Sequence, residues 1–208
     1  MFNLQYKIKV CGMTEANNIR EIEQLHPNLM GFIFYPPSPR YCKEKPSYLP
    51  TTAKHVGVFV DATKAEILDK VKDFGLDYVQ LHGKESPEFC QELQQEGILL
   101  IKAFPISEAS DIVITQAYEG LCEYFLFDTK TPKKGGSGEQ FDWNLLQKYR
   151  GNTPFLLSGG IGLNCIDQLK DFQHPLLAGY DLNSKFETAP GIKDLTLLQR
   201  FINSFQNE

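Results

Sequence analysis

The sequence lacks the features that mark several large classes of protein. No apolar stretch approaches the length of about 18 residues that a membrane-spanning helix requires. The first ten residues, MFNLQYKIKV, contain no positively charged segment followed by a long apolar run, so they do not resemble a secretory leader. We therefore expect a cytoplasmic protein that is not embedded in a membrane.

Cysteine is present, but its spacing excludes two common uses. The chain has five cysteines, an odd number, and no two of them form a C-x-x-C pair. Neither a disulfide framework nor a structural zinc site is indicated, and we expect no metal ion. Free thiols fit a reducing compartment. The positions are Cys11, Cys42, Cys90, Cys122 and Cys165.

Positive charge is also scarce. The net charge is −5 and the pI is near 5.5. Nucleic acids and anionic membrane surfaces are bound by basic fields, so we expect neither as a partner. Any anionic ligand of this protein must instead be held by a few local groups.

What the sequence does contain is a regular alternation of strand-like and helix-like segments. Its 208 residues are 42% hydrophobic and 23% charged, which is typical of one globular domain over residues 1–208. Eight short apolar runs have strand character. They are Tyr6–Val10, Leu29–Phe34, His55–Val60, Tyr78–Leu81, Leu99–Phe104, Glu123–Phe127, Phe155–Ser158 and Leu177–Leu182.

Helix-like segments lie between several of these runs and follow residues that commonly cap helices. Thr14, Thr63, Ser86 and Asp194 precede segments over 15–25, 64–74, 87–95 and 195–205, whereas the second and sixth connections are less clear. Eight units of about 26 residues predict an α/β fold, a compact single eightfold β/α (TIM) barrel. An open doubly wound sheet is the alternative, and the strand count disfavours it.

In such a barrel the functional groups follow the strands, at the C-terminal end of the sheet. Polar residues and glycines do follow the predicted strands here. The loops after the seventh and eighth strands match the usual position of a phosphate site. The groups are Cys11–Gly12, the segment 35–40, Asp61, His82–Gly83, Asp128, Gly159–Gly162 and Asn183–Ser184.

The stretch FLFDTKTPKKGGSGEQFDW, residues 125–143, is the most distinctive of these. A strand ends on the carboxylate of Asp128, and a loop containing Gly136 and Gly138 follows. Glycine lets a backbone approach a ligand closely, so the N–H groups of this loop could bind an anion. A flexible surface loop is the simpler interpretation of this stretch taken alone.

Seven motifs, in order along the chain, resemble those of phosphoribosylanthranilate isomerases, a family of tryptophan biosynthesis. They are KVCGMT, GFIFYPPSPRY, VGVFV, VQLHGKE, FDTKTPKKGGSGEQFDW, LLSGGI and PGIKD. The resemblance implies a TIM-barrel enzyme that acts on a phosphosugar. We expect it to be a monomer that needs no cofactor.

The implied reaction is the Amadori rearrangement of N-(5-phosphoribosyl)anthranilate to 1-(2-carboxyphenylamino)-1-deoxyribulose 5-phosphate. An acid protonates the furanose ring oxygen and the ring opens to an iminium. A base then removes the proton at sugar C2, and the resulting enolamine tautomerises to the ketone. The resemblance assigns the base to Cys11 and the acid to Asp128.

Each of the two catalytic residues has a simpler alternative. Cys11 could be a small buried hydrophobe, but strand alternation puts Lys9 on its side, and a cation would lower the thiol pKa from about 8.5. Asp128 could cap a turn. As an acid it needs a pKa above its usual value of about 3.9, which burial beside an anionic substrate would supply.

Four further residues are predicted to bind the sugar and the aromatic ring: Lys9, Arg40, His82 and Asp181. The planar fork of Arg40 suits the anthranilate carboxylate, and the alternative is a solvated surface arginine. His82 could orient the substrate or tune the base, or be a structural histidine. Asp181 could hold sugar hydroxyls or only line the barrel.

The phosphate is assigned to the loops after strands six, seven and eight. The predicted contacts are Gly136, Gly138, Gly159, Gly160, Asn183 and Ser184. Lys185 departs from the family pattern, which has glycine there: its β-carbon would block a positive φ, or its charge reaches the phosphate itself. We also predict that the sixth loop, with Lys133 and Lys134, closes over the substrate.

Two other functions are compatible with the same fold. The similar isomerase of histidine biosynthesis performs this rearrangement on a larger substrate with two phosphates, but its family uses a first-strand aspartate where this chain has Cys11. A phosphosugar-binding barrel without catalysis is the second alternative. The presence of both Cys11 and Asp128 argues against it.

Overall fold

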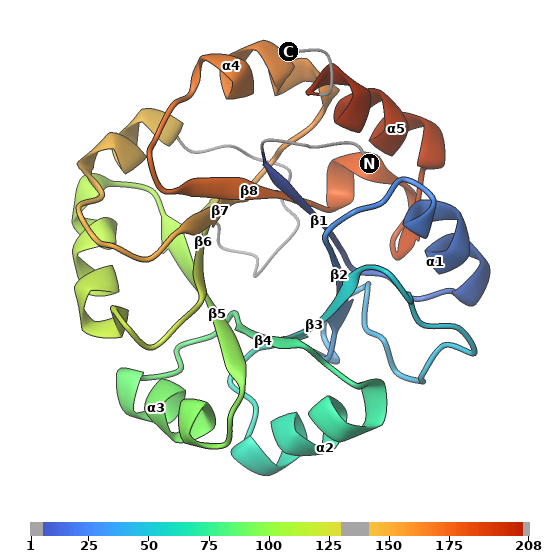
Figure 1. The fold of residues 1–208 in the computed structure, drawn as a ribbon, viewed down its shortest axis with the longest axis horizontal. Helices are drawn as coiled ribbons and strands as arrows, with labels where there is room; N and C mark the ends of the chain where they lie inside the picture. Colours follow the sequence, from blue (N-terminus) through green and yellow to red (C-terminus); the bar gives the residue numbers. More distant parts are fainter. Residues whose placement is uncertain (1–5, 130–141, 206–208) are drawn as a thin grey trace.

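The computed structural model describes residues 6–129 and 142–205, and their eight parallel strands form a closed barrel. Each strand pairs with the next one along the chain, and the eighth pairs with the first. Figure 1 shows these strands as an inner ring with the helices outside. The predicted barrel is confirmed. Its strands are β1 (Lys7–Cys11), β2 (Leu29–Ile33), β3 (Lys54–Phe59), β4 (Tyr78–Leu81), β5 (Leu99–Ile106), β6 (Tyr124–Thr129), β7 (Phe155–Leu157) and β8 (Leu177–Leu182).

The helices cover the outside of the barrel, and the described parts of the fifth and sixth connections contain 3₁₀ helices. None of the helices in the described part is long and apolar enough to cross a membrane. The short strands β9 (Glu187–Ala189) and β10 (Ile192–Lys193) form a separate hairpin. The helices are α1 (Ala16–Glu23), α2 (Lys64–Phe74), α3 (Pro87–Gln95), α4 (Ile166–Asp171), α5 (Leu195–Ser204), η1 (Ala109–Tyr118), η2 (Trp143–Lys148), η3 (Leu163–Cys165) and η4 (Ser184–Phe186).

Three of the four predicted helix caps are confirmed. The side chains of Thr63, Ser86 and Asp194 each accept a hydrogen bond from the backbone N–H three residues further on. Such a bond satisfies one of the free donors in the first helical turn. The second connection, residues 34–53, contains no helix, which explains why its pattern was indistinct.

The predicted cap at Thr14 is wrong. Helix α1 has Glu15 at its N-cap, and the Glu15 side chain makes no capping bond. The hydroxyl of Thr14 instead donates to the carbonyl of Gly191, 2.9 Å away, in the turn of the β9–β10 hairpin. The local pattern assigned the Thr14 side chain to the helix cap, but this side chain makes a long-range contact instead.

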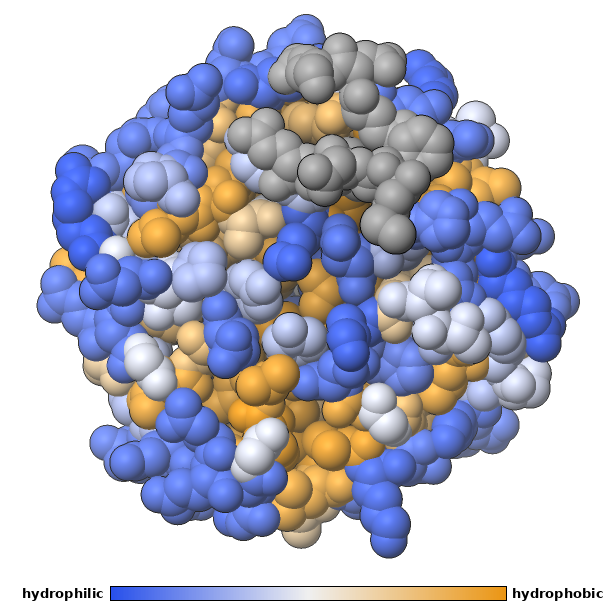
Figure 2. Space-filling model, in the orientation of Figure 1, coloured by the Kyte–Doolittle hydropathy of each residue, from blue (hydrophilic) through white to orange (hydrophobic). Residues whose placement is uncertain are grey.

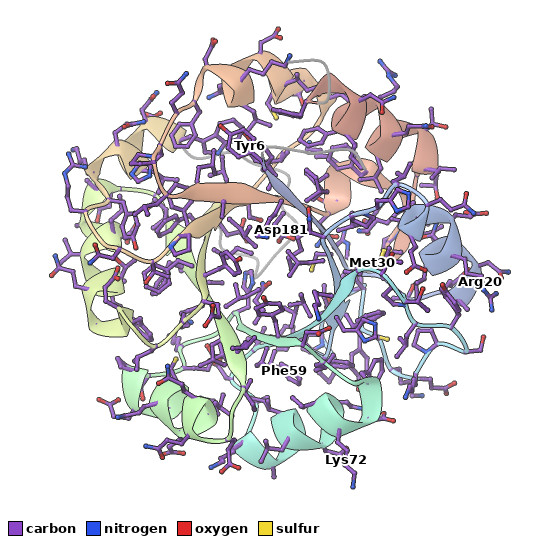
Figure 3. The ribbon with its side chains drawn as sticks, in the orientation of Figure 1. Tyr6, Arg20, Met30, Phe59, Lys72 and Asp181 are labelled. Atoms are coloured by element: carbon purple, nitrogen blue, oxygen red, sulfur yellow. The ribbon has the colours of Figure 1, made fainter. Side chains whose placement is uncertain are left out.

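Side chains of the strands alternate between the barrel interior and the layer under the helices. Figure 3 shows Asp181 pointing into the barrel, whereas Met30 and Phe59 point toward the helices. The rim of the face seen in Figure 2 is largely hydrophilic, and apolar residues are exposed inside this rim. The apolar interior cluster consists of Cys11, Leu29, Val56, Val58, Ile101, Ala103, Leu126 and Leu156.

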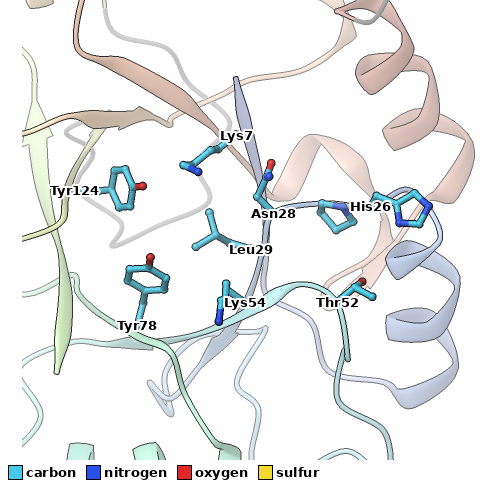
Figure 4. Close-up of a pocket in the computed structure, with 9 residues that line it drawn as sticks. Lys7, His26, Asn28, Leu29, Thr52, Lys54, Tyr78 and Tyr124 are labelled. Carbon is cyan, nitrogen blue, oxygen red and sulfur yellow. The ribbon is translucent and has the colours of Figure 1, made fainter. Parts of the chain in front are cut away.

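A pocket opens at the N-terminal end of the barrel (Figure 4). Its wall includes Lys7, Leu29, Lys54, Tyr78 and Tyr124, which lie at or near the starts of their strands. The groups predicted to carry the chemistry lie at the strands' other ends. This pocket is therefore separate from the candidate site.

A buried ion pair fixes the loops after β3 and β4. The ammonium of Lys102 lies 3.1 Å from Glu85 and donates to the carbonyl of Gly83 at 2.9 Å, and both charged side chains are 3% exposed. Glu85 in turn accepts from the backbone N–H groups of Asp61 and Gly83. Neither ion can be lost without leaving the other buried and uncompensated.

We predict that Lys102→Met lowers the free energy of unfolding by about 3–5 kcal/mol, because it leaves the Glu85 carboxylate buried without its cation. Urea denaturation at neutral pH measures this. Lys72→Met is the control, since Lys72 is exposed and points away from the barrel in Figure 3. A loss of the same size in both variants would contradict the prediction.

Candidate active site

The residues predicted for the site meet at one mouth of the barrel. Cys11, Asp128 and Asn183 lie at or directly after the ends of β1, β6 and β8, and His82 directly follows β4. All eight strands run parallel, so these ends share one mouth. Of the predicted residues, Gly136, Gly138, Lys133 and Lys134 lie outside the described part of the chain.

Lys9 and Asp181 form a buried ion pair next to Cys11. The Lys9 ammonium is 0% exposed and lies 2.8 Å from the Asp181 carboxylate, which Ser158 also approaches at 3.4 Å. Burial alone would lower the pKa of Lys9, but the charges of Asp181 and Cys11 raise it above its ordinary value. Lys9 is therefore a fixed cation. Asp181 is held by this pair, and its predicted contact with sugar hydroxyls stays a prediction.

The pKa of Cys11 differs from our expectation. Burial raises it, and although Lys9 acts in the predicted direction, its charge offsets that effect only in part. The pKa of the thiol is therefore raised, and the thiol is protonated at neutral pH in the absence of substrate. The sequence placed the cation correctly but gave no measure of how deeply the thiol is buried.

Space for the thiol comes from a glycine on the neighbouring strand. A β-carbon at Gly31 would lie 2.7 Å from the sulfur of Cys11, closer than real contacts permit. Gly31 pairs with Cys11 in the β1–β2 register. This glycine opens the GFIFYPPSPRY motif, and its role was not recognised from the sequence.

Asp128 is held by groups from two strand segments, its own strand β6 and the end of β4. The backbone N–H of Thr129 donates to Asp128 Oδ1 at 2.8 Å, and Nε2 of His82 lies 3.4 Å from Oδ2. Gln80 contacts the other nitrogen of His82, with 2.8 Å between Nε2 of Gln80 and Nδ1. His82 therefore lies beside Asp128, the predicted acid. Its predicted roles toward the substrate and the base stay predictions.

Arg40 belongs to a cluster that the sequence did not reveal. Its Nε and Nη2 donate to the carboxylate of Glu187 at 2.7–2.9 Å. The ammonium of Lys193 lies 2.6 Å from Glu187 and donates to Asn183 Oδ1 at 2.7 Å. Arg40 is thus a buried residue, 9% exposed, and not a solvated surface arginine.

The charges of this cluster do not cancel. Burial would raise the pKa of Glu187, but Arg40 and Lys193 bring it below its usual range, so the carboxylate is ionised. Burial lowers the pKa of Lys193, and Glu187 offsets this only in part. Two cations share one anion, which favours a further anion at this side of the mouth. Lys193 lies in the motif PGIKD, and Glu187 lies two positions after Lys185, but no local sequence pattern indicates that they pair with Arg40.

The loops after β7 and β8 touch one another. Gly159 and Gly160 have φ of +87° and +67°. The β-carbon of Lys185 lies 3.3 Å from the position that a β-carbon of Gly162 would occupy. Among the described non-glycine residues only His26 and Asp61 have positive φ, so Lys185 does not need the backbone freedom of glycine. Lys185 thus has no positive φ, and both predicted effects of this residue on phosphate contact stay predictions.

A closed β/α barrel with a thiol, a carboxyl group, an imidazole and a buried arginine at its C-terminal mouth defines an enzyme of the TIM-barrel class. No group of three or more His, Cys, Asp or Glu side chains within residues 6–129 and 142–205 is arranged to hold a metal ion. The thiol, carboxyl and imidazole groups at the mouth can each donate or accept a proton.

Comparison with known proteins identifies the family. The model for N-(5'-phosphoribosyl)anthranilate (PRA) isomerase matches residues 8–204, and the chain belongs to this family. A PRA isomerase from Phocaeicola vulgatus is 50% identical over 201 residues, covering 97% of this chain and 98% of its own. The protein is thus an enzyme of tryptophan biosynthesis that isomerises N-(5'-phosphoribosyl)anthranilate.

Solved structures agree with this assignment. The PRA isomerase of Thermotoga maritima has a TM-score of 0.83 and 32% identity, with 98% of this chain and 100% of that chain covered. Another PRA isomerase structure, in complex with reduced 1-(o-carboxyphenylamino)-1-deoxyribulose 5-phosphate, has a TM-score of 0.79 and 29% identity over 98% and 100% of the chains. The T. maritima enzyme is also described as dimeric, so the monomeric state expected for this chain stays a prediction.

We predict that Gly159→Ala lowers both stability and kcat/KM. A β-carbon at Gly159 would lie 2.8 Å from the backbone nitrogen of Thr129 and 3.0 Å from Asp128 Oδ1, and the φ of +87° is strained for alanine. We expect kcat/KM to fall by at least about 10-fold, because the methyl group displaces the carboxyl group. Steady-state kinetics and urea unfolding measure the two effects.

The matched control for Gly159 is Gly97→Ala. Gly97 has a similar φ of +80° but no atom within 4 Å of an added β-carbon. It should lose about 1–3 kcal/mol of stability through backbone strain alone and keep its activity. If both variants kept full activity, crowding at Asp128 would have no catalytic effect.

Proposed function

We propose that Asp128 and Cys11 carry the two proton transfers of the isomerisation. The observation that supports this is their placement: both lie on inward-facing positions at the ends of β6 and β1, with a donor group beside each. A site of this kind needs one acid and one base on the two sides of the sugar C1–C2 bond. Among the other charged groups described there, Lys9 and Asp181 are engaged with one another, and Arg40 and Lys193 are engaged with Glu187.

In the first step Asp128 gives its proton to the furanose ring oxygen. The C1–O bond breaks with its electrons on that oxygen, and the lone pair of the anilino nitrogen forms the C=N bond of an iminium. Negative charge then develops on the Asp128 carboxylate. The backbone N–H of Thr129, 2.8 Å from Oδ1, and the imidazole of His82 can stabilise this charge.

In the second step the thiol proton of Cys11 is first lost to solvent, and the resulting thiolate removes the proton from sugar C2. The C–H electrons form the C1=C2 bond, and the iminium nitrogen takes up the former C=N electron pair. The resulting enolamine tautomerises to the ketone. The raised pKa of Cys11 is compatible with this order, because the cationic iminium is formed first and favours loss of the thiol proton. The fixed cation Lys9 acts in the same direction.

The two anionic ends of the substrate are assigned to different sides of the mouth. We place the anthranilate carboxylate at Arg40, where the cluster with Lys193 and Glu187 has one positive charge in excess. We place the phosphate at Gly159, Gly160, Asn183 and Ser184, with Lys185 in reach as a point charge. Asn183 lies between the carboxylate region and the phosphate region, because its side-chain oxygen accepts a hydrogen bond from Lys193 of the Arg40 cluster.

The cellular location of the protein is linked to the chemistry of its cysteines. We propose a cytoplasmic location, because all five cysteines are free and four of them are buried. Cys11 must remain a thiol to act as a base. An oxidising compartment would not suit this reaction.

We predict that Cys11→Ala and Asp128→Asn each lower turnover by roughly 10² to 10⁴-fold while product affinity is largely retained, because each removes one proton transfer. Single-turnover kinetics and product titration measure the two quantities, with growth of a tryptophan-requiring strain as a second readout. Cys90→Ala is the control, since Cys90 is buried on helix α3 outside the barrel and the variant should remain active. Activity within about threefold of wild type in either catalytic variant contradicts the assignment.

We predict that Arg40→Lys is impaired and that Arg40→Ala is worse, by roughly 10 to 150-fold in kcat/KM, because a charge-assisted contact of about 1.5–3 kcal/mol is lost. Lysine keeps the charge but not the planar fork.

The control must separate this contact from the ion pair between Arg40 and Glu187. A substrate analogue built on aniline has no carboxylate, so Arg40→Ala should lose little further activity on it. An equal loss on both substrates would show that Arg40 acts through Glu187 and the structure of the mouth.

A further inference from the structure

We propose that Gln80 is a positioning residue that fixes the tautomer of His82, so that the Nε2–H of His82 faces Asp128. The two residues lie two positions apart, Gln80 within β4 and His82 directly after it. Both therefore point into the barrel, Gln80 beneath and His82 at the mouth. The catalytic consequence, though not the tautomer itself, rests on the proposed role of Asp128 as the acid.

The direction of the hydrogen bond carries the proposal. Nε2 of Gln80 lies 2.8 Å from Nδ1 of His82, and an amide nitrogen can only donate. Nδ1 is therefore the acceptor, and in a neutral imidazole the single proton is on Nε2. That nitrogen lies 3.4 Å from Oδ2 of Asp128, a contact that a small rotation of either side chain shortens to a hydrogen bond.

Burial makes Gln80 a specific partner. The side chain is 1% exposed, so water does not compete for its amide. Its Oε1 is one of three buried side-chain polar atoms without a hydrogen-bond partner among the described residues. A buried polar group left in this way is unfavourable, and such groups are often found where function requires them. In this position the hydrogen bond from Nε2 to His82 is the favourable contact that offsets the unpaired Oε1.

Turning the amide over would not serve the site equally well. Oε1 would then face Nδ1 and require a proton there, and the lone pair of His82 Nε2 would face Asp128. The contact with Nδ1 would then use Oε1, and neither hydrogen of Nε2 would donate to His82. Once Asp128 is ionised, the imidazole lone pair would also lie against a carboxylate.

The consequence concerns the charge that forms during ring opening. When Asp128 gives up its proton, negative charge appears on its carboxylate, and an N–H already aimed at Oδ2 becomes a charge-assisted hydrogen bond. A carboxyl group keeps an acceptor oxygen in either protonation state, so the contact persists through the step. Gln80 thus acts through His82 by holding it in the form that stabilises the product of the proton transfer.

The tautomer can be measured directly by ¹⁵N NMR of histidine-labelled protein, because protonated and unprotonated imidazole nitrogens have distinct shifts. The chain has four histidines, and the His82 signals are identified as those lost in His82→Asn. In wild type, with the ring neutral, Nε2 should carry the proton and Nδ1 should not. This readout needs no substrate.

Two variants of Gln80 should change that spectrum. In Gln80→Glu, a carboxylate of the same shape accepts from Nδ1, so Nδ1 should become protonated. In Gln80→Leu, Nδ1 loses its donor and the two tautomers should mix. In both variants kcat should fall by about 10-fold or more, while KM stays within about threefold, because the substrate itself is not contacted.

Ile101→Val is the matched control, since Ile101 is the register partner of Gln80 on β5 and faces the same interior. It should lower the unfolding midpoint but leave the His82 tautomer and kcat unchanged. Proton on Nδ1 in wild type, or an unchanged tautomer in both Gln80 variants, overturns the proposal even if Asp128→Asn is inactive. An active Asp128→Asn would instead overturn the proposed acid and leave the NMR result standing.

Discussion

The ion pair between Lys9 and Asp181 lies at the seam where the barrel closes. The two residues are register partners on β1 and β8, they are 172 positions apart, and their side chains are 0% and 6% exposed. A buried charge without its partner is strongly unfavourable, so the pair favours this strand register over a shifted one. The same ammonium lies beside Cys11 and counters the effect of burial on its pKa. The register at which the barrel closes and the pKa of the Cys11 thiol therefore both depend on the ion pair between Lys9 and Asp181.

The other buried charges follow the same rule around the C-terminal end of the barrel. Lys102 on β5 forms an ion pair with Glu85 in the loop after β4, and Arg40 and Lys193 share Glu187 at the mouth. The charges of Lys102 and Glu85 cancel, whereas the cluster of Arg40, Lys193 and Glu187 has one positive charge in excess. In a chain with a net charge of −5, this local excess of positive charge favours an anion at this side of the mouth.

Much of the fold and part of the site could be predicted from the sequence. Period-two alternation places Lys9 beside Cys11, and the ends of apolar runs locate Asp128 and His82. The contacts of Thr14 with Gly191 and of Arg40 with Glu187 could not be predicted, because they join residues 177 and 147 positions apart. The raised pKa of Cys11 could not be predicted either, since it depends on burial by strands distant in sequence.

The supporting groups of the site have a simple relation to the reactive ones. Because strand side chains alternate, the residue two positions before an inward-facing group at the mouth lies directly beneath it in the barrel. Lys9 lies beneath Cys11, Gln80 beneath His82 and Asp181 beneath Asn183, and each of these three is buried and polar. Leu126 beneath Asp128 is the exception, and Asp128 takes its support from Thr129 and from the neighbouring His82 instead. In this barrel a layer of buried polar side chains therefore lies beneath the mouth and orients the side chains above it.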